Sequence, residues 1–225
     1  VLTIHGGPMS ASTAAFDMRA QLFAAQGWLV FSPNYRGSTN LGRAYQRAVI
    51  NDAGAGPGRD VMAGVEVIKK MGIVDEKKIA VSGWSYGGYM TTWLTSHYHG
   101  WAAAVAGAAV TDWFDWYTLS DMNVWSGYGL GGSPWIDGND ENYRIQSPIT
   151  YAHLIRTPML ILSTTLDPRV SATQSFKLYS VLRDHDVPVQ FIAYPVPGHY
   201  PGDPVHRRDV LKRWMVWIEE HIGGE

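Results

Sequence analysis

Residues 78–94 read KIAVSGWSYGGYMTTWL, and this stretch decides the fold. The apolar run IAVSG predicts a buried β-strand, and the Met-, Thr- and Trp-rich run after the glycines predicts a helix. Between them stands Ser85, in the pattern Gly83-x-Ser85-x-Gly87. A sharp strand-to-helix corner holds such a serine in a strained conformation, and small neighbours keep the turn from clashing with adjacent elements. The hydroxyl then projects from the sheet, while the helix N-terminus offers N–H groups to a developing oxyanion.

The rest of the chain alternates apolar strands with helices. We expect strands at residues 1–7, 28–38, 77–83, 101–110, 158–164 and 189–195, helices at 12–27, 58–72, 86–98, 171–185 and 203–222, and an irregular Trp- and Gly-rich section at 112–147. This alternation predicts a mostly parallel sheet with helices on both faces. No internal repeat or low-complexity linker divides the chain, so we expect residues 1–225 to form one α/β domain.

The composition excludes several classes of function. Apolar residues make up 46% of the 225 residues and charged residues 17%, so the chain can bury a substantial core. Lys and Arg are scattered and the net charge is −2, which disfavours a nucleic-acid surface. The longest small-apolar run, WAAAVAGAAV, is too short to span a membrane. There are no cysteines and no secretory signal is visible, and we expect a cytoplasmic protein without a cofactor.

Two further groups would complete a serine hydrolase site. The G-x-S-x-G string is weak by itself, but here it has the strand before and the helix after that the motif requires. A serine hydroxyl needs a base, and the base needs a group that orients it. Asp167 follows the strand at 158–164, and His199 follows the strand at 189–195. Both fall on the rim that carries Ser85, so we expect Ser85 as nucleophile, His199 as base and Asp167 as the orienting acid.

The other histidines and acids occupy weaker positions. Six histidines lie near helix ends or in a loop, where capping or solvation is the expected role: His97, His99, His153, His185, His206 and His221. His5 precedes two glycines and is expected to organise their loop. Asp186 and Asp203 are close in sequence to His199, but they do not fit the expected Ser, Asp, His order. No H-x-x-x-H or H-E-x-x-H pair occurs, so no metal site is expected.

An acyl-transfer site also needs N–H donors for the oxyanion. The backbone N–H of Tyr86, directly after the nucleophile, is expected to be one of them. The other is expected from the HGGP motif at residues 5–8, where a glycine lets the backbone approach closely. Gly6 or Gly7 could supply this group, and Gly7 is favoured.

Six motifs together resemble a known family. HGGP, SPNYRGST, GWSYGGYMT, SPITYAHLIRTPMLIL, DPRVSATQSFKLYSVLRDHDVPVQF and YPVPGHYP resemble the catalytic domain of the prolyl oligopeptidase family, and within it the acylaminoacyl-peptidase and dipeptidyl-aminopeptidase branches. The resemblance implies an α/β-hydrolase fold and a serine peptidase mechanism. It puts Ser85, Asp167 and His199 on the family's nucleophile, acid and base. Tyr86 and Gly7 fall on the oxyanion donors of this branch.

The sequence departs from the family pattern in two ways. Family members usually carry an N-terminal β-propeller that filters substrates by size, and their hydrolase domain has strands before HGGP. Here the chain starts at Val1, directly on the strand that leads to HGGP. We therefore expect the propeller and the N-terminal strands to be missing, as in a trimmed catalytic domain or the C-terminal portion of a longer protein. Thr165 stands where the family often has glycine, a change that leaves Asp167 in place.

Three functions are compatible with these residues. The first is a serine peptidase that cleaves short peptides through an acyl-enzyme on Ser85. The second is a carboxylesterase that acts on short-chain esters with the same triad, because both reactions pass through the same acyl-enzyme. The third is a non-catalytic hydrolase-fold interaction protein, which the complete triad disfavours. We expect a short peptide or ester as the partner, with no nucleic acid and no membrane, and the oligomeric state is left open.

Two further features have two interpretations each. The aromatic residues of section 112–147 could line a pocket beside the serine or pack over the sheet. Arg36 in PNYRGS could bind a substrate carboxylate or form a structural ion pair, and the ion pair is favoured.

Overall fold

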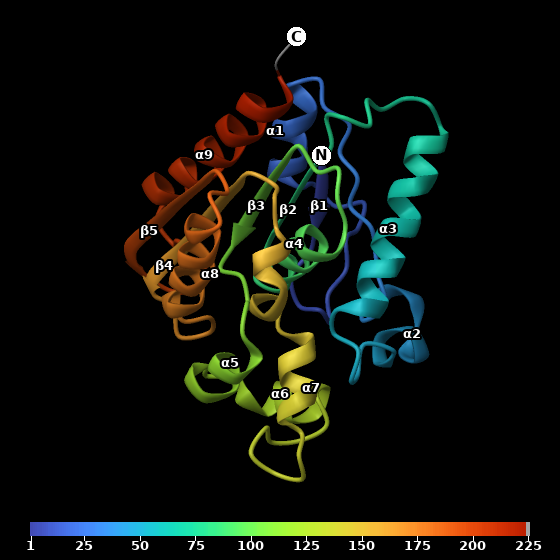
Figure 1. Cartoon of the computed structure of the whole chain (residues 1–225). Helices are drawn as coiled ribbons and strands as arrows, with labels where there is room; N and C mark the ends of the chain where they lie inside the picture. The colour runs from blue at the N-terminus through green and yellow to red at the C-terminus, as the bar shows by residue number, and fades with distance from the viewer. Residues whose placement is uncertain (224–225) are drawn as a thin grey trace.

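The computed structural model describes residues 1–223. Its centre is a five-stranded parallel sheet with the strand order β1-β2-β3-β4-β5 (Figure 1). The strands are β1 (Leu2–Ile4), β2 (Ala80–Trp84), β3 (Ala103–Gly107), β4 (Met159–Leu166) and β5 (Val189–Pro197). Because the five strands run in one direction, their carboxyl ends share one edge of the sheet, where α/β proteins place their functional groups. The predicted parallel sheet is confirmed.

Helices connect the strands and cover the sheet. They are α1 (Met18–Ala25), α2 (Arg43–Arg47), α3 (Ala55–Lys70), α4 (Tyr86–His97), α5 (Trp113–Leu119), α6 (Asn123–Gly129), α7 (Asp140–Gln146), α8 (Ala172–Asp184) and α9 (Pro204–Ile222), with short 3-10 turns η1 (Thr39–Leu41) and η2 (Pro148–Leu154). Aspartate side chains cap the N-termini of α1 and α9. Asp17 accepts a backbone N–H at the start of α1, and Asp203 accepts two at the start of α9.

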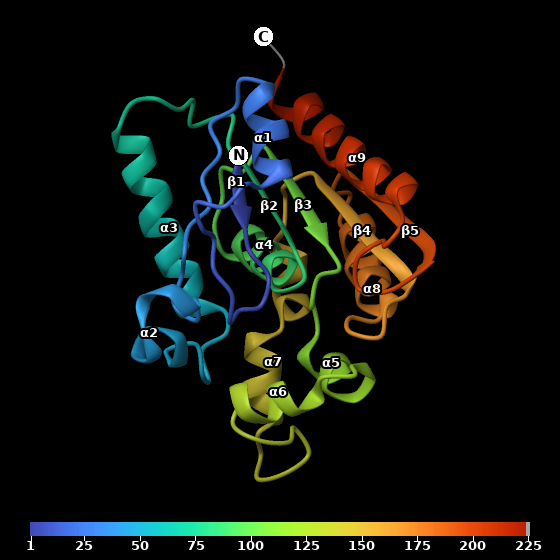
Figure 2. The same ribbon diagram turned by 180° about the vertical axis from the view of Figure 1, so that it is seen from behind.

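Two apolar cores sandwich the sheet, because successive strand residues point to opposite faces. On one face, strand residues such as Ala104 and Ile161 pack with α3, α4 and α8. On the other, their neighbours Val105 and Leu160 pack with α1 and α9. Figures 1 and 2 show α1 and α9 side by side, and α5, α6 and α7 beyond the carboxyl ends of the strands. Helices thus cover both faces, as the sequence predicts.

The predicted strand at residues 28–38 is wrong as an extended strand. Only Phe31 bridges to β1: its N–H donates to Val1 O (3.0 Å) and its carbonyl accepts from Thr3 N (2.9 Å). The next donor in a parallel ladder would be residue 33, two positions on. That residue is Pro33, which has no N–H, so the pairing ends after one bridge.

Most element ends shift by up to three residues, and two other segments differ more from the prediction. The helix predicted at 12–27 begins only at Met18, because Asp17 is its cap. Section 112–147 is not irregular, since it holds the three short helices α5, α6 and α7. Each of these has seven residues, too few for helical periodicity to stand out in the sequence.

Candidate active site

Ser85 lies at the corner between β2 and α4, in a backbone conformation that is unusual for a residue with a side chain. Its φ is +63° and its ψ is −121°. Such a conformation costs roughly 1–3 kcal/mol and persists only where the surroundings enforce it. Here backbone bonds hold both sides, because Ser85 N donates to Gly107 O (2.8 Å) and Ser85 O accepts from Tyr89 N (2.9 Å).

The glycines of the motif are required by close backbone contacts. A Cβ atom on Gly87 would lie 2.2 Å from the carbonyl oxygen of Ile4 in β1. One on Gly83 would lie 2.4 Å from the carbonyl carbon of Gly87. Neither neighbour can move aside, because both are backbone atoms of packed elements. The spacing G-x-S-x-G therefore reflects the tight passage of α4 over β1 and β2.

His199 and Asp167 form a hydrogen-bonded pair beyond the ends of β5 and β4. His199 Nδ1 lies 2.7 Å from Asp167 Oδ2, and the Asp167 side chain is fully buried. The other carboxylate oxygen accepts the backbone N–H groups of Arg169 (2.8 Å) and Val170 (3.0 Å). An ionised carboxylate only accepts, so Nδ1 carries the proton of this bond and Nε2 is available as a base.

The predicted Ser85–His199 contact is not formed in this structure. His199 Nε2 is buried and has no hydrogen-bond partner within residues 1–223. Catalytic hydrogen bonds are often long before substrate binds, so the geometry is compatible with the predicted role. The assignment of Ser85, His199 and Asp167 as a triad stays a prediction.

One side chain connects the serine corner to the histidine loop. The indole Nε1–H of Trp84, the residue before Ser85, donates to the carbonyl of His199 (2.8 Å). The Trp84 ring also meets Tyr200 edge-on, with centroids 4.7 Å apart. Trp84 is not among the predicted site residues, and no local pattern in the sequence identifies it, because the contact spans 115 positions.

The HGGP loop lies against the serine. A Cβ atom on Gly6 would lie 3.4 Å from Ser85 Cβ and 4.0 Å from its Oγ. Gly7 has a φ of +127°, a conformation that favours glycine. Tyr86 is the first residue of α4, so its N–H has no acceptor within the helix. The roles of Tyr86 and Gly7 as oxyanion donors stay predictions.

His5 organises this loop, in keeping with the structural role expected from the sequence. Its Nε2 lies 2.9 Å from the hydroxyl of Ser38, and its ring stacks on Tyr35. The Tyr35 hydroxyl in turn donates to the carbonyl of His5 (2.7 Å). Burial lowers the pKa of His5, which favours a neutral ring at neutral pH.

Comparison with known proteins identifies the family. A profile described as the prolyl oligopeptidase family matches residues 14–225. The chain belongs to the prolyl oligopeptidase family. The resemblance read from the sequence is therefore confirmed, and the fold is that of an α/β-hydrolase.

Named relatives in the prolyl oligopeptidase family match almost the whole chain. Dipeptidyl-peptidase 5 of Aspergillus oryzae is 29% identical over 99% of this chain, and the acylamino-acid-releasing enzyme of Rattus norvegicus is 27% identical over 100% of it. The solved structure of an acylaminoacyl peptidase from Pyrococcus horikoshii is 28% identical and matches 98% of the chain with a TM-score of 0.93. The chain spans about a third of the length of these relatives, namely 31%, 31% and 36%.

The aromatic section of this family member is mainly a packed core. Trp113 and Tyr143 are almost fully buried, and the Trp113 ring packs edge-on against Trp116 (5.5 Å). Trp135 is the contrast, with 67% of its surface exposed. Packing, the second interpretation of these aromatics, therefore describes most of them.

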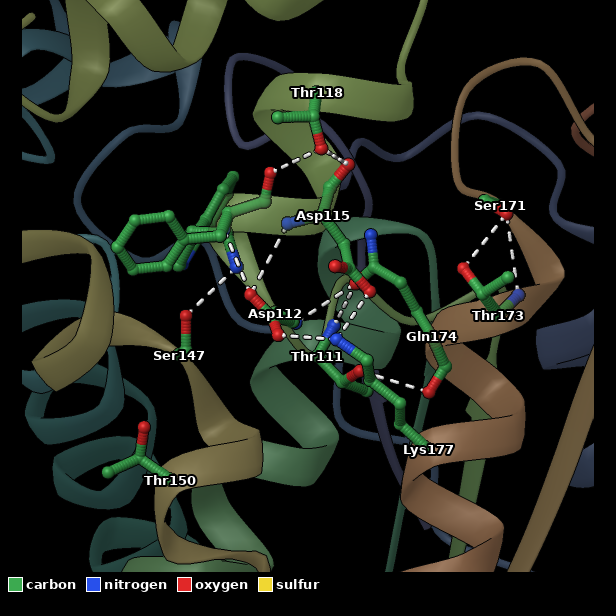
Figure 3. A network of polar contacts seen from close by, with 12 residues as sticks. Thr111, Asp112, Asp115, Thr118, Ser147, Thr150, Ser171, Thr173, Gln174 and Lys177 are labelled. Carbon is green, nitrogen blue, oxygen red and sulfur yellow. Dashed lines mark hydrogen bonds and ion pairs between the residues drawn. The ribbon is translucent and has the colours of Figure 1, made fainter. Parts of the chain in front are cut away.

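A polar network fastens this section to α8 (Figure 3). The side-chain oxygen of Gln174 accepts the backbone N–H groups of Thr111 (2.6 Å) and Asp112 (3.0 Å). Lys177, one turn further along α8, forms ion pairs with Asp112 (2.9 Å) and Asp115 (2.7 Å). The start of α5 is thus tied to the helix that follows the acid loop.

Two rival site residues have structural partners. Asp203 caps α9 and its Oδ2 lies 2.8 Å from Nδ1 of His206, so it is engaged away from His199. Arg36 forms a two-pronged ion pair with Asp60 at 2.8 Å, which confirms the structural interpretation. Burial acts to raise the pKa of the Asp60 carboxyl, but the bonds from Arg36 outweigh it and lower that pKa.

Residues 1–223 contain neither a cluster of metal ligands nor a membrane-spanning helix. Across residues 1–223, no three carboxylate, imidazole or thiol groups come together as a metal site. Over the same residues, no helix combines the length and apolar character needed to cross a bilayer.

Proposed function

We propose that this chain is the catalytic domain of a serine peptidase, spanning residues 1–225, which cleaves amide bonds of short peptides through an acyl-enzyme on Ser85. Membership of the prolyl oligopeptidase family supports the reaction class. The observation that carries the assignment is the His199–Asp167 pair, whose buried Nε2 has no partner within residues 1–223. The main chain of His199 accepts a hydrogen bond from Trp84, and Trp84 directly precedes the strained Ser85.

The proposed reaction follows from the proton positions. His199 Nε2 takes the proton of the Ser85 hydroxyl as the oxygen attacks the peptide carbonyl, and Asp167 stabilises the imidazolium that forms. The backbone N–H groups of Tyr86 and Gly7 bind the oxyanion. His199 then gives its proton to the leaving amine, which leaves the acyl group on Ser85. Water, activated by the same imidazole, releases the acid.

The substrate class is proposed from the relatives. One relative is named a dipeptidyl-peptidase and another an acylamino-acid-releasing enzyme, and both names describe release of a small unit from a peptide. We propose short peptides as substrates, with either a free or an acylated N-terminus. An ester would react at the same serine, but its leaving group needs less help from His199, so ester cleavage is the less demanding reaction.

The test compares two p-nitroanilides, which share one leaving group, with a p-nitrophenyl ester. We would measure kcat/KM for acetyl-alanyl p-nitroanilide, for alanyl p-nitroanilide and for a short-chain p-nitrophenyl ester, with Ser85→Ala as the control. Anilide cleavage that disappears in Ser85→Ala supports the peptidase, and the ratio of the two anilides gives the preferred N-terminus. Turnover of the ester alone would show that the chain acts as an esterase and not as a peptidase. Full activity in Ser85→Ala would overturn the nucleophile.

A further inference from the structure

The backbone and the side chain of Trp84 contact different parts of the site. Its backbone ends β2 directly before Ser85, while its ring lies against Gly107 of β3. A Cβ atom on Gly107 would lie only 2.1 Å from the indole Cε3, so the indole uses the space that a glycine leaves open. Gly107 also accepts the backbone N–H of Ser85 (2.8 Å). The ring position is therefore linked to the backbone of the nucleophile corner.

The far edge of the indole reaches the histidine loop. Trp84 Nε1–H donates to the carbonyl of His199 (2.8 Å), and the ring of Tyr200 packs edge-on against the indole at 73°. At the start of this loop Gly198 has a φ of +95°, and its N–H donates to the carbonyl of Leu166 (3.3 Å). A second side chain helps, because the Thr164 hydroxyl donates to the carbonyl of Gly198.

The His199 side chain and main chain thus have different anchors. Asp167 fixes the orientation of the imidazole through Nδ1. That bond cannot by itself fix where the ring sits relative to Ser85, because both partners lie on loops after β4 and β5. The indole of Trp84 joins the main chain of His199 to the chain segment that carries the serine.

We propose that Trp84 is a positioning residue for the base: its indole N–H sets the place of His199 relative to Ser85. This role rests on the proposed function, since it concerns proton transfer between those two residues. A displacement of about 1 Å in a catalytic group can reduce the rate about a hundredfold. We therefore expect loss of the indole N–H to lower kcat by about tenfold to a hundredfold, with KM within about twofold.

The variant Trp84→Phe keeps an aromatic ring over Gly107 and removes the N–H. Trp214→Phe is the matched control. Trp214 is buried in the core that Trp84 packs against, and its indole nitrogen has no hydrogen-bond partner within residues 1–223. Both variants lose the same atoms in the same region, but only Trp84→Phe loses a hydrogen bond. A purely structural role would therefore affect the melting temperature of both and the chemistry of neither.

The first measurement is the rate at which a fluorophosphonate labels Ser85, with Ser85→Ala as the blank. Labelling needs the base but no peptide recognition. We expect Trp84→Phe to label about tenfold to a hundredfold more slowly than Trp214→Phe. Rates within twofold of each other would overturn the proposal. Failure of the unmodified chain to label at Ser85 would instead overturn the proposed function.

The second measurement does not depend on activity. Proton NMR follows the His199 Nδ1 proton, which is bonded to Asp167, and its exchange with solvent. Faster exchange in Trp84→Phe, but not in Trp214→Phe, supports a role of Trp84 in holding His199 even if no labelling is seen. An unchanged resonance and exchange rate in Trp84→Phe would show that His199 keeps its place without the indole.

Discussion

The nucleophile corner at residues 83–88 and the section at 112–147 lie at the same end of the sheet, but different forces hold them. The corner is built from backbone contacts: glycine Cα atoms pass carbonyl groups of β1 and β3 too closely for any side chain. The section is held by side chains, above all Gln174 and Lys177 of α8 (Figure 3). A backbone contact restricts residue type locally, whereas a side-chain contact depends on a partner elsewhere in the chain.

The largest effect is expected from an added methyl group at the corner. Gly87→Ala would bring a Cβ to 2.2 Å from the carbonyl oxygen of Ile4, so α4 or β1 has to shift. We expect a loss of about 3 kcal/mol in the free energy of unfolding, the upper part of the range for overpacked sites. Urea unfolding gives this value, and fluorophosphonate labelling reports whether Ser85 keeps its place.

The control for this substitution lies in the other region. Gly127 is in α6, and a Cβ atom there would meet nothing within 4 Å. Gly127→Ala should therefore leave the protein as stable or raise its stability by up to about 1 kcal/mol through helix propensity. Equal losses in the two variants would mean that the corner is no more tightly packed than the section.

The second-largest loss of stability is expected on replacing the buried side-chain amide of Gln174. Gln174→Leu leaves the N–H groups of Thr111 and Asp112 without their acceptor. Each buried unpaired donor costs about 1–3 kcal/mol. Gln174 Nε2 is itself buried without a partner in residues 1–223, and its removal offsets part of that cost, so we expect a net loss of about 2 kcal/mol.

Hydrogen exchange separates this effect from the first. In Gln174→Leu, amides of residues 112–147 should exchange faster while those of β2 and α4 are unchanged. Gln190→Leu, at an exposed position of β5, is the matched control and should change neither region. Uniformly faster exchange across the whole chain would contradict a local attachment.

The sequence predicts the sheet and the corner well, because both depend on local patterns. The run IAVSG and the spacing of Gly83, Ser85 and Gly87 indicate strand, corner and helix without knowledge of any distant partner. The position of His199 beside Asp167 could also be predicted, since both follow parallel strands and the ends of such strands share one edge.

What the sequence could not predict depends on contacts between distant residues. The short helices of section 112–147 pack through aromatic rings and through Gln174, whose partners are more than 60 positions away. Trp84 is a further case, since its indole contacts a carbonyl 115 positions later. The single bridge at Phe31 is a different case. Pro33 can be read in the sequence, but the hydrogen bond that it removes is known only once Phe31 is seen to pair with β1.

The smallest loss of stability is expected on replacing Lys177, an exposed residue of α8 that also contacts the start of α5. Its side chain is 44% exposed, so Lys177→Met should cost no more than about 1 kcal/mol. Lys70→Met, at an exposed lysine of α3 with no ion pair within residues 1–223, is the control and should have no effect. High salt should reduce the cost in Lys177→Met, because ions screen exposed pairs.

The stability that Lys177 contributes should be lost at high pH. Burial acts to lower the pKa of Lys177, but the bonds with Asp115 and Asp112 outweigh it and raise that pKa above the usual 10.5. A cation with a raised pKa in the folded state stabilises fully below its unfolded pKa and loses this contribution as pH rises through the folded value. The difference in unfolding free energy between the unmodified chain and Lys177→Met should therefore be constant from pH 7 to about 9 and shrink above about 10.5. A difference that persists undiminished at pH 11.5 would mean that the lysine stem, rather than its charge, holds α5 to α8.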